Sequence, residues 1–155
     1  MKYFLLFFAL LISESSLACQ CMYAGKFSEY TSHEDIGIVR AKVMSYGAQL
    51  SFGSTLYESM AVEVLEVIKG KYSHRDLYLL GDPGNLCRDY VDSKRFPIGS
   101  EHFISIANQK LVQPLGGCGE SSVIIQDGRV NGIVIENEKY IQYSADLDEF
   151  IEEIK

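Results

Sequence analysis

Four cysteines constrain this 155-residue chain more than any other feature of its sequence. Cys19 and Cys21 are separated by one residue, whereas Cys87 and Cys118 lie far along the chain. An even number of cysteines in an oxidising compartment predicts two disulfides. Because a bond between Cys19 and Cys21 would strain a very short ring, each is expected to reach separately to Cys87 or to Cys118. One short segment would then be tied to two distant parts of the fold.

Residues 1–18 have the pattern of a cleavable secretion signal. They carry an early positive charge at Lys2, an apolar run of ten residues, and the small residues Ser16 and Ala18 at the cleavage position. The apolar run is shorter than the ~20 residues that span a bilayer, so no membrane span is expected. We therefore predict a signal peptide over 1–18 and a single domain over 19–155.

The alternative interpretation of this cleavage site is a lipid anchor on Cys19. Bacterial lipoproteins usually carry Leu three residues before the lipidated cysteine and a small residue two before it. Here Ser16 and Leu17 stand in the reverse order. This order favours plain secretion, to the extracellular space or to a Gram-negative periplasm.

The exported part of the chain is acidic. Loss of Lys2 and Glu14 with the leader leaves 13 basic and 20 acidic residues, a net charge of −7. This balance argues against nucleic acid and anionic membrane surfaces as partners. The remaining 137 residues are enough for one domain with its own hydrophobic core, and we expect a monomer.

Apolar residues recur with a period of two in several segments, which is typical of half-buried strands. The two longest segments, 35–47 and 56–70, are expected to form a long hairpin. Shorter strands are expected at 76–81 and around 103–107, and Asp127-Gly128 is a hairpin turn signal between two more.

Two helices complete the expected structure. Residues 26–33 are compatible with a short helix. At the end of the chain the period changes, with Leu147, Phe150, Ile151 and Ile154 at helical spacing and Ser144 as a candidate cap. Many short strands with few helices predict an all-β fold with accessory helices, in which a small barrel carries the C-terminal helix on its surface. Periodicity alone does not separate an oligonucleotide/oligosaccharide-binding (OB) barrel from a sandwich.

Several motifs, in order along residues 19–120, resemble the tissue inhibitors of metalloproteinases and the wider netrin-like family. They are CQC at the mature start, IVRAKV, VEVLEVIKGK, LCR at the third cysteine, FPIGSEHFISI and CGE. The resemblance implies a five-stranded barrel of the OB type. It also implies disulfides between Cys19 and Cys87 and between Cys21 and Cys118.

In the inhibitors of this family the amino terminus is the active part. A catalytic zinc keeps three protein ligands and one open position for water. The resemblance implies that the amine and carbonyl oxygen of Cys19 chelate the zinc of a target metalloendopeptidase, while Gln20 enters its specificity pocket. The chain itself would be no enzyme and would need no cofactor. The inhibitory surface would comprise Cys19, Gln20, Cys21 and Met22, with a ridge of Gly84, Asn85, Leu86, Cys87 and Arg88.

The alternative is a secreted netrin-like module that binds a protein or a glycan without inhibiting a protease. It is favoured by three departures: Gln20 is longer than the Ser or Thr common there, a third disulfide has no cysteines, and a hairpin and helix replace the family's carboxyl-terminal subdomain. An unrecognised hydrolase is a third reading, but no motif singles out a catalytic pair. The three histidines, His33, His74 and His102, lack the spacing of a metal site.

Overall fold

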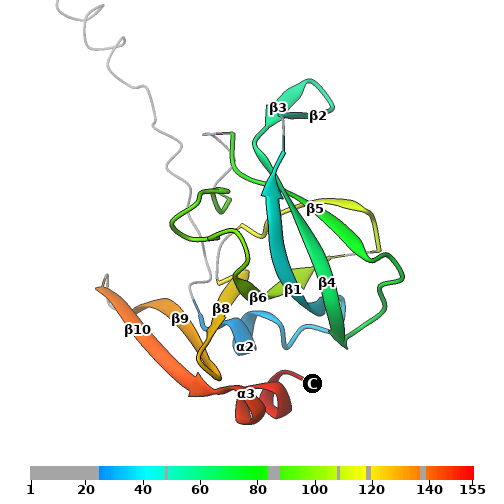
Figure 1. The fold of residues 1–155 in the computed structure, drawn as a ribbon. Helices are drawn as coiled ribbons and strands as arrows, with labels where there is room; N and C mark the ends of the chain where they lie inside the picture. The colour runs from blue at the N-terminus through cyan, green and yellow to red at the C-terminus, as the bar shows by residue number, and fades with distance from the viewer. Residues whose placement is uncertain (1–24, 48, 84–87, 108, 118–119, 137–138) are drawn as a thin grey trace, which may run out of the picture.

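The structure is a computed structural model that describes residues 25–155 except 48, 84–87, 108, 118–119 and 137–138 (Figure 1). The predicted signal peptide, both predicted disulfides and most of the predicted inhibitory surface therefore lie outside the described residues. The site residues outside it are Cys19, Gln20, Cys21, Met22, Gly84, Asn85, Leu86, Cys87 and Cys118.

The described residues are mostly β-strand, with short helices at both ends. The helices are α2 (Phe27–Tyr30) and α3 (Leu147–Ile154). The strands are β1 (Gly37–Tyr46), β2 (Leu50–Phe52), β3 (Thr55–Tyr57), β4 (Ser59–Lys69), β5 (Asp76–Leu80), β6 (Glu101–Ile106), β7 (Val112–Pro114), β8 (Ser122–Gln126), β9 (Arg129–Glu136) and β10 (Lys139–Asp146).

Eight of these strands form one sheet in the order β10-β9-β8-β6-β1-β4-β5-β7, and β2 and β3 form a small separate hairpin. All neighbours are antiparallel except β5 and β7, which are parallel. The predicted all-β class with a C-terminal helix is confirmed. The order is open, with β10 at one end and β7 at the other, whereas the sequence predicted five strands closed into a barrel.

The long hairpin expected from residues 35–47 and 56–70 is present as β1 paired with β4. Its register shifts at three places along β1. Such irregularities bend a strand and increase its twist, which lets the sheet curve around its own side chains. The β2–β3 hairpin joins the two long strands and projects beyond them (Figure 1).

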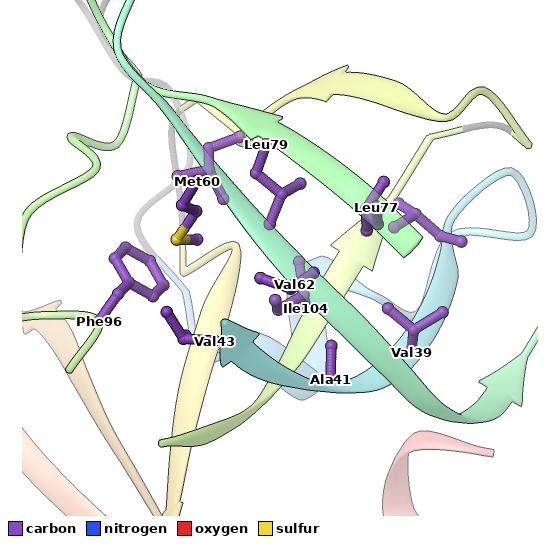
Figure 2. Packing of buried hydrophobic residues seen from close by; sticks show 11 residues of the cluster. Val39, Ala41, Val43, Met60, Val62, Leu77, Leu79, Phe96 and Ile104 are labelled. Atoms are coloured by element: carbon purple, nitrogen blue, oxygen red, sulfur yellow. The ribbon is translucent and has the colours of Figure 1, made fainter. Parts of the chain in front are cut away.

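The inner core lies inside this curvature. Side chains from β1, β4, β5 and β6 point into one space, and Phe96 from the loop before β6 joins them (Figure 2). Its buried members are Val39, Ala41, Val43, Met60, Val62, Leu77, Leu79, Phe96, Ile104, Ile106 and Leu115.

The outer core lies on the other side of β1, β6 and β8, where both helices cover the sheet. Its buried members are Phe27, Ile38, Phe103, Val123, Val130, Phe150 and Ile154. The ring of Phe150 lies 5.7 Å from that of Phe103 and 6.1 Å from that of Phe27, measured between centroids. Burial of the apolar face of α3 is thus confirmed at Phe150, while Ile151 is only half-buried.

In the carboxyl-terminal part, the predicted hairpin turn is confirmed and the predicted helix cap is wrong. Asp127 and Gly128 have φ of 51° and 72°, as a two-residue hairpin turn requires, and they join β8 to β9 as expected. The cap of α3 is Asp146 and not Ser144, since the Asp146 carboxylate accepts hydrogen bonds from the backbone N–H groups of Asp148 and Glu149.

Candidate functional site

Arg88 belongs to the predicted ridge and lies within the described residues. Its backbone N–H donates to the Asp82 carboxylate at 2.6 Å, and it forms an isolated antiparallel bridge with Gly117. In the sequence Cys87 directly precedes Arg88, and Cys118 directly follows Gly117. The bridge therefore joins the two segments that carry the distant cysteines.

Asp89 reinforces this connection. Its backbone N–H donates to the Gly116 carbonyl at 3.3 Å, and its carboxylate accepts from the Ser121 hydroxyl at 2.5 Å. The same carboxylate accepts two hydrogen bonds from the Arg95 guanidinium, at 2.6 and 3.0 Å. Such a two-pronged pair fixes geometry as well as charge. Arg88 and Asp89 are thus held against Gly116, Gly117 and Ser121.

The amino-terminal helix meets the same segment. A side chain at Gly116 would lie 3.2 Å from the Tyr30 hydroxyl and would clash with Ser121, so this position leaves room only for glycine. Just beyond the same, carboxyl-terminal end of α2, the Lys69 ammonium donates to the carbonyls of Thr31 and His33, at 2.6 and 3.3 Å. A cation suits the carbonyl end of a helix.

Glu120 follows the Gly116–Gly117 segment and is buried, with 8% of its surface exposed. Its carboxylate accepts from the backbone N–H of Phe27 at 3.0 Å, from that of Ile133 at 2.5 Å, and from the Tyr143 hydroxyl. Burial raises the pKa of Glu120, while the hydrogen bonds from Tyr143, Ile133 and Phe27 lower it. One carboxylate thereby joins the start of α2, β9 and β10.

We call these contacts around Arg88, Asp89, Gly117 and Glu120 the junction. Every buried side-chain nitrogen and oxygen of the described residues has a hydrogen-bond partner. The junction therefore holds segments in place, which suits a rigid binding surface. Sequence reasoning missed Asp82, Asp89, Ser121 and Glu120, although Glu120 ends the CGE motif.

The histidines and acidic residues do not gather into a metal site in the part of the chain that the structure describes. His33 is exposed, and His74 lies edge-on to Tyr72 with ring centroids 5.5 Å apart. His102 is buried, with its Nε2 2.8 Å from the Ser100 hydroxyl. Burial, with a smaller contribution from Arg95, lowers the pKa of His102 to about 4.

Comparisons with family models, with curated proteins and with solved structures found no match to this chain. Among the described residues, no helix has the length and apolar character needed to cross a membrane.

Proposed function

We propose that this protein is a secreted inhibitor of zinc metalloendopeptidases that acts through the amine and carbonyl oxygen of Cys19. The observation that carries the proposal is the Arg88–Gly117 bridge, because it joins the chain neighbours of Cys87 and Cys118. A terminus bonded to both cysteines would lie beside the Arg88 ridge, as this mode of inhibition requires.

The reach of the chain supports the same arrangement. The backbone of Phe27 is hydrogen-bonded to Glu120, which is two residues after Cys118. Cys21 is six residues before Phe27. Six residues of extended chain span at most about 20 Å. Cys118 can be at most about 7 Å from Glu120 along the chain. The chain is therefore long enough for a disulfide between Cys21 and Cys118.

We also infer that the sheet closes as a five-stranded OB-type barrel in which β7 and β8 together act as one interrupted strand. The strand β7 pairs with β5, and β8 pairs with β6. Hydrogen bonds from Leu115 to Leu80 and from Ser105 to Ser121 extend these two pairings toward one another. The order β1-β4-β5-β7/β8-β6 then returns to β1, since β6 also pairs with β1.

The proposed mechanism needs a rigid terminus more than a reactive group. The amine of Cys19 would displace the zinc-bound water of the protease, and the carbonyl oxygen would complete the chelate. An α-amine with an ordinary pKa of ~8 loses its proton readily to a zinc ion near neutral pH. Two disulfides would hold the terminus in place before binding, so little conformational entropy would be lost.

The test is an alanine added before Cys19. This turns the amine into an amide, which has no comparable lone pair, and pushes an extra residue into the metal site. We expect inhibition of a panel of secreted zinc endopeptidases to fall at least 100-fold, since the chelate is lost. The matched control carries the extra alanine after Lys155 and should inhibit like the correctly cleaved protein.

Two results would contradict the proposal. Equal inhibition by the protein with and without the amino-terminal alanine would refute chelation. Non-reducing peptide mapping that finds a free thiol, or Cys87 linked to Cys118, would refute the tethered terminus.

The second candidate is a binding module for a protein or a glycan, without inhibition. It is favoured by two exposed apolar side chains on one face of the β9–β10 hairpin, Ile133 and Tyr140, which are 51% and 79% exposed. An exposed aromatic ring beside an aliphatic side chain is typical of binding surfaces. No inhibition by the correctly cleaved protein across the whole panel would favour this function.

A further inference from the structure

We propose that the carboxyl-terminal hairpin β9–β10 is a noncovalent brace that positions the amino-terminal segment, acting through Glu120 and Tyr143. This inference rests on the proposed function, since it names positioning residues for the inhibitory terminus. It assigns a role to the hairpin and helix that follow the barrel strands.

The first argument is the hydrogen bonding of Glu120. One of its oxygens accepts from the Phe27 backbone and from the Tyr143 hydroxyl, and the other accepts from the Ile133 backbone. Phe27 is the first residue of α2, and the preceding N-cap residue, Lys26, makes no side-chain cap. A backbone N–H in the first turn of a helix needs an acceptor from elsewhere. Glu120 supplies it across 93 residues of sequence.

The second argument is that Tyr143 contacts Glu120 and also Lys26, the residue before Phe27. Its hydroxyl donates to Glu120, and the Lys26 ammonium lies 5.6 Å from the centroid of its ring. Any side chain at Gly132, opposite Tyr143 on β9, would clash with the Glu120 carboxylate and the Tyr143 ring. The hairpin is thus shaped to bring its backbone close to Glu120.

The third argument is the chemistry of a buried carboxylate. Burial of a charged group costs free energy, and packed apolar residues of the same volume often give a more stable fold. Here burial raises the pKa of Glu120, so the charged form is not the one that burial favours. The buried Glu120 carboxylate accepts hydrogen bonds from α2, β9 and β10, and it thereby fixes the relative position of these three elements.

The position of Phe27 connects the brace to the inhibitory terminus. Phe27 is fully buried against Phe150 and follows Cys21 by only six residues. Glu120 follows Cys118 by two. When the brace is lost, the start of α2 gains freedom, and only the two proposed disulfides would then hold the terminus against the Arg88 ridge.

The experiment compares Tyr143→Phe and Glu120→Gln with control substitutions of the same residue types. Tyr140→Phe removes an exposed hydroxyl from β10, and Glu101→Gln removes a carboxylate that is paired with Arg40. Two quantities are measured for each full-length secreted variant: the inhibition constant for a zinc endopeptidase and the hydrogen exchange rate of the Phe27 amide. A third control, Ile104→Val in the inner core, lowers the melting temperature without touching the brace.

We expect Tyr143→Phe and Glu120→Gln to raise the inhibition constant about tenfold or more and to speed Phe27 exchange by a similar factor. Release of the Phe27 backbone would expose its amide to solvent and would loosen the amino-terminal segment. The three controls should leave both quantities within about twofold. Unchanged Phe27 exchange in the two brace variants would overturn the inference. Faster exchange with an unchanged inhibition constant would also overturn it, since the brace would then only stabilise the fold. Wild-type protein that inhibits no protease would instead refute the proposed function, and the Phe27 exchange rate would still decide whether the brace holds α2.

Discussion

The two cores of this protein are built in different ways. The inner core is enclosed by the strands themselves, and its residues come from the middle of the chain. The outer core is covered by α2 and α3, which lie at opposite ends of the described chain. Changes in the inner core should therefore affect stability alone, whereas changes in the outer core should also move the amino-terminal segment.

A buried titratable group also lies beside each core, and acid affects the two in opposite directions. His102 lies beside Phe96 of the inner core, with ring centroids 5.0 Å apart, and its pKa is lowered. Glu120 borders the outer core and its pKa is raised. A fall in pH should therefore lower stability through His102 and not through Glu120.

The largest expected effect is that of Phe150→Ala in the outer core. Phe150 is 2% exposed and packs between the rings of Phe27 and Phe103. Loss of a buried aromatic ring should lower the free energy of unfolding by about 4 kcal/mol, measured by chemical denaturation. Ile151→Ala, at a half-buried position of the same helix, should cost clearly less. Equal losses for both variants would mean that α3 does not depend on its buried face.

The second prediction concerns His102 and acid. Because its pKa in the folded protein is about 4, below the ordinary 6.5, the unfolded chain takes up the proton first as the pH falls. The contribution of His102 is therefore complete above pH 6.5 and is lost between 6.5 and 4. The full loss should reach up to about 3 kcal/mol.

The measurement is the free energy of unfolding from pH 7 to pH 4 in the wild type and in His102→Gln. The variant should show a shallower decline, because it lacks the titrating ring, and its absolute stability is not the readout. His74→Gln, which removes an exposed histidine, should decline like the wild type. Parallel curves for wild type and His102→Gln would contradict the prediction.

Most strands were predictable because their side chains alternate between a buried and an exposed face. β1 is the clearest case, with Val39, Ala41 and Val43 buried in the inner core. β10 was not predicted as a separate strand because the sequence after the Asp127-Gly128 turn was interpreted as one apolar strand, whereas the structure divides it into β9 and β10. The Ser144 cap was wrong because pairing of β10 with β9 continues as far as Asp146.

The junction could not be predicted because its bonds are not local. Glu120 is 93 residues from Phe27, 23 from Tyr143 and 13 from Ile133. Only the folded sheet brings those donors to one carboxylate, so a lone acidic residue in CGE carries no visible signal. Of the predicted site, Arg88 alone is described, and the disulfide pairing stays a prediction.

The third prediction concerns Gly132, where β9 approaches Glu120 at the border of the outer core. An alanine there would meet the Glu120 carboxylate and the Tyr143 ring, and such overpacking should cost about 2 kcal/mol in unfolding free energy. Phe27 exchange should accelerate as well, because the brace is displaced. Asn131→Ala, one residue earlier on β9, should leave Phe27 exchange unchanged. If the two variants behave alike, the close approach of β9 to Glu120 is not what holds α2.

The smallest expected effect is that of the cap of α3. The Asp146 carboxylate accepts from the N–H groups of Asp148 and Glu149 at 2.9 and 3.4 Å, so Asp146→Ala leaves two helix donors without their acceptor. The expected loss is about 1 kcal/mol of unfolding free energy. Ser144→Ala should cost less, about 0.5 kcal/mol, because it removes only an exposed hydrogen bond that the Ser144 hydroxyl accepts from the Arg129 guanidinium at 2.8 Å. A larger loss for Ser144→Ala would mean that α3 begins earlier and that β10 ends before Ser144. Because α3 covers only the outer core, Asp146→Ala should also speed hydrogen exchange at the Phe150 amide. The Ile104 amide in the inner core should stay protected. Equal changes at both amides would show that the two cores unfold as one.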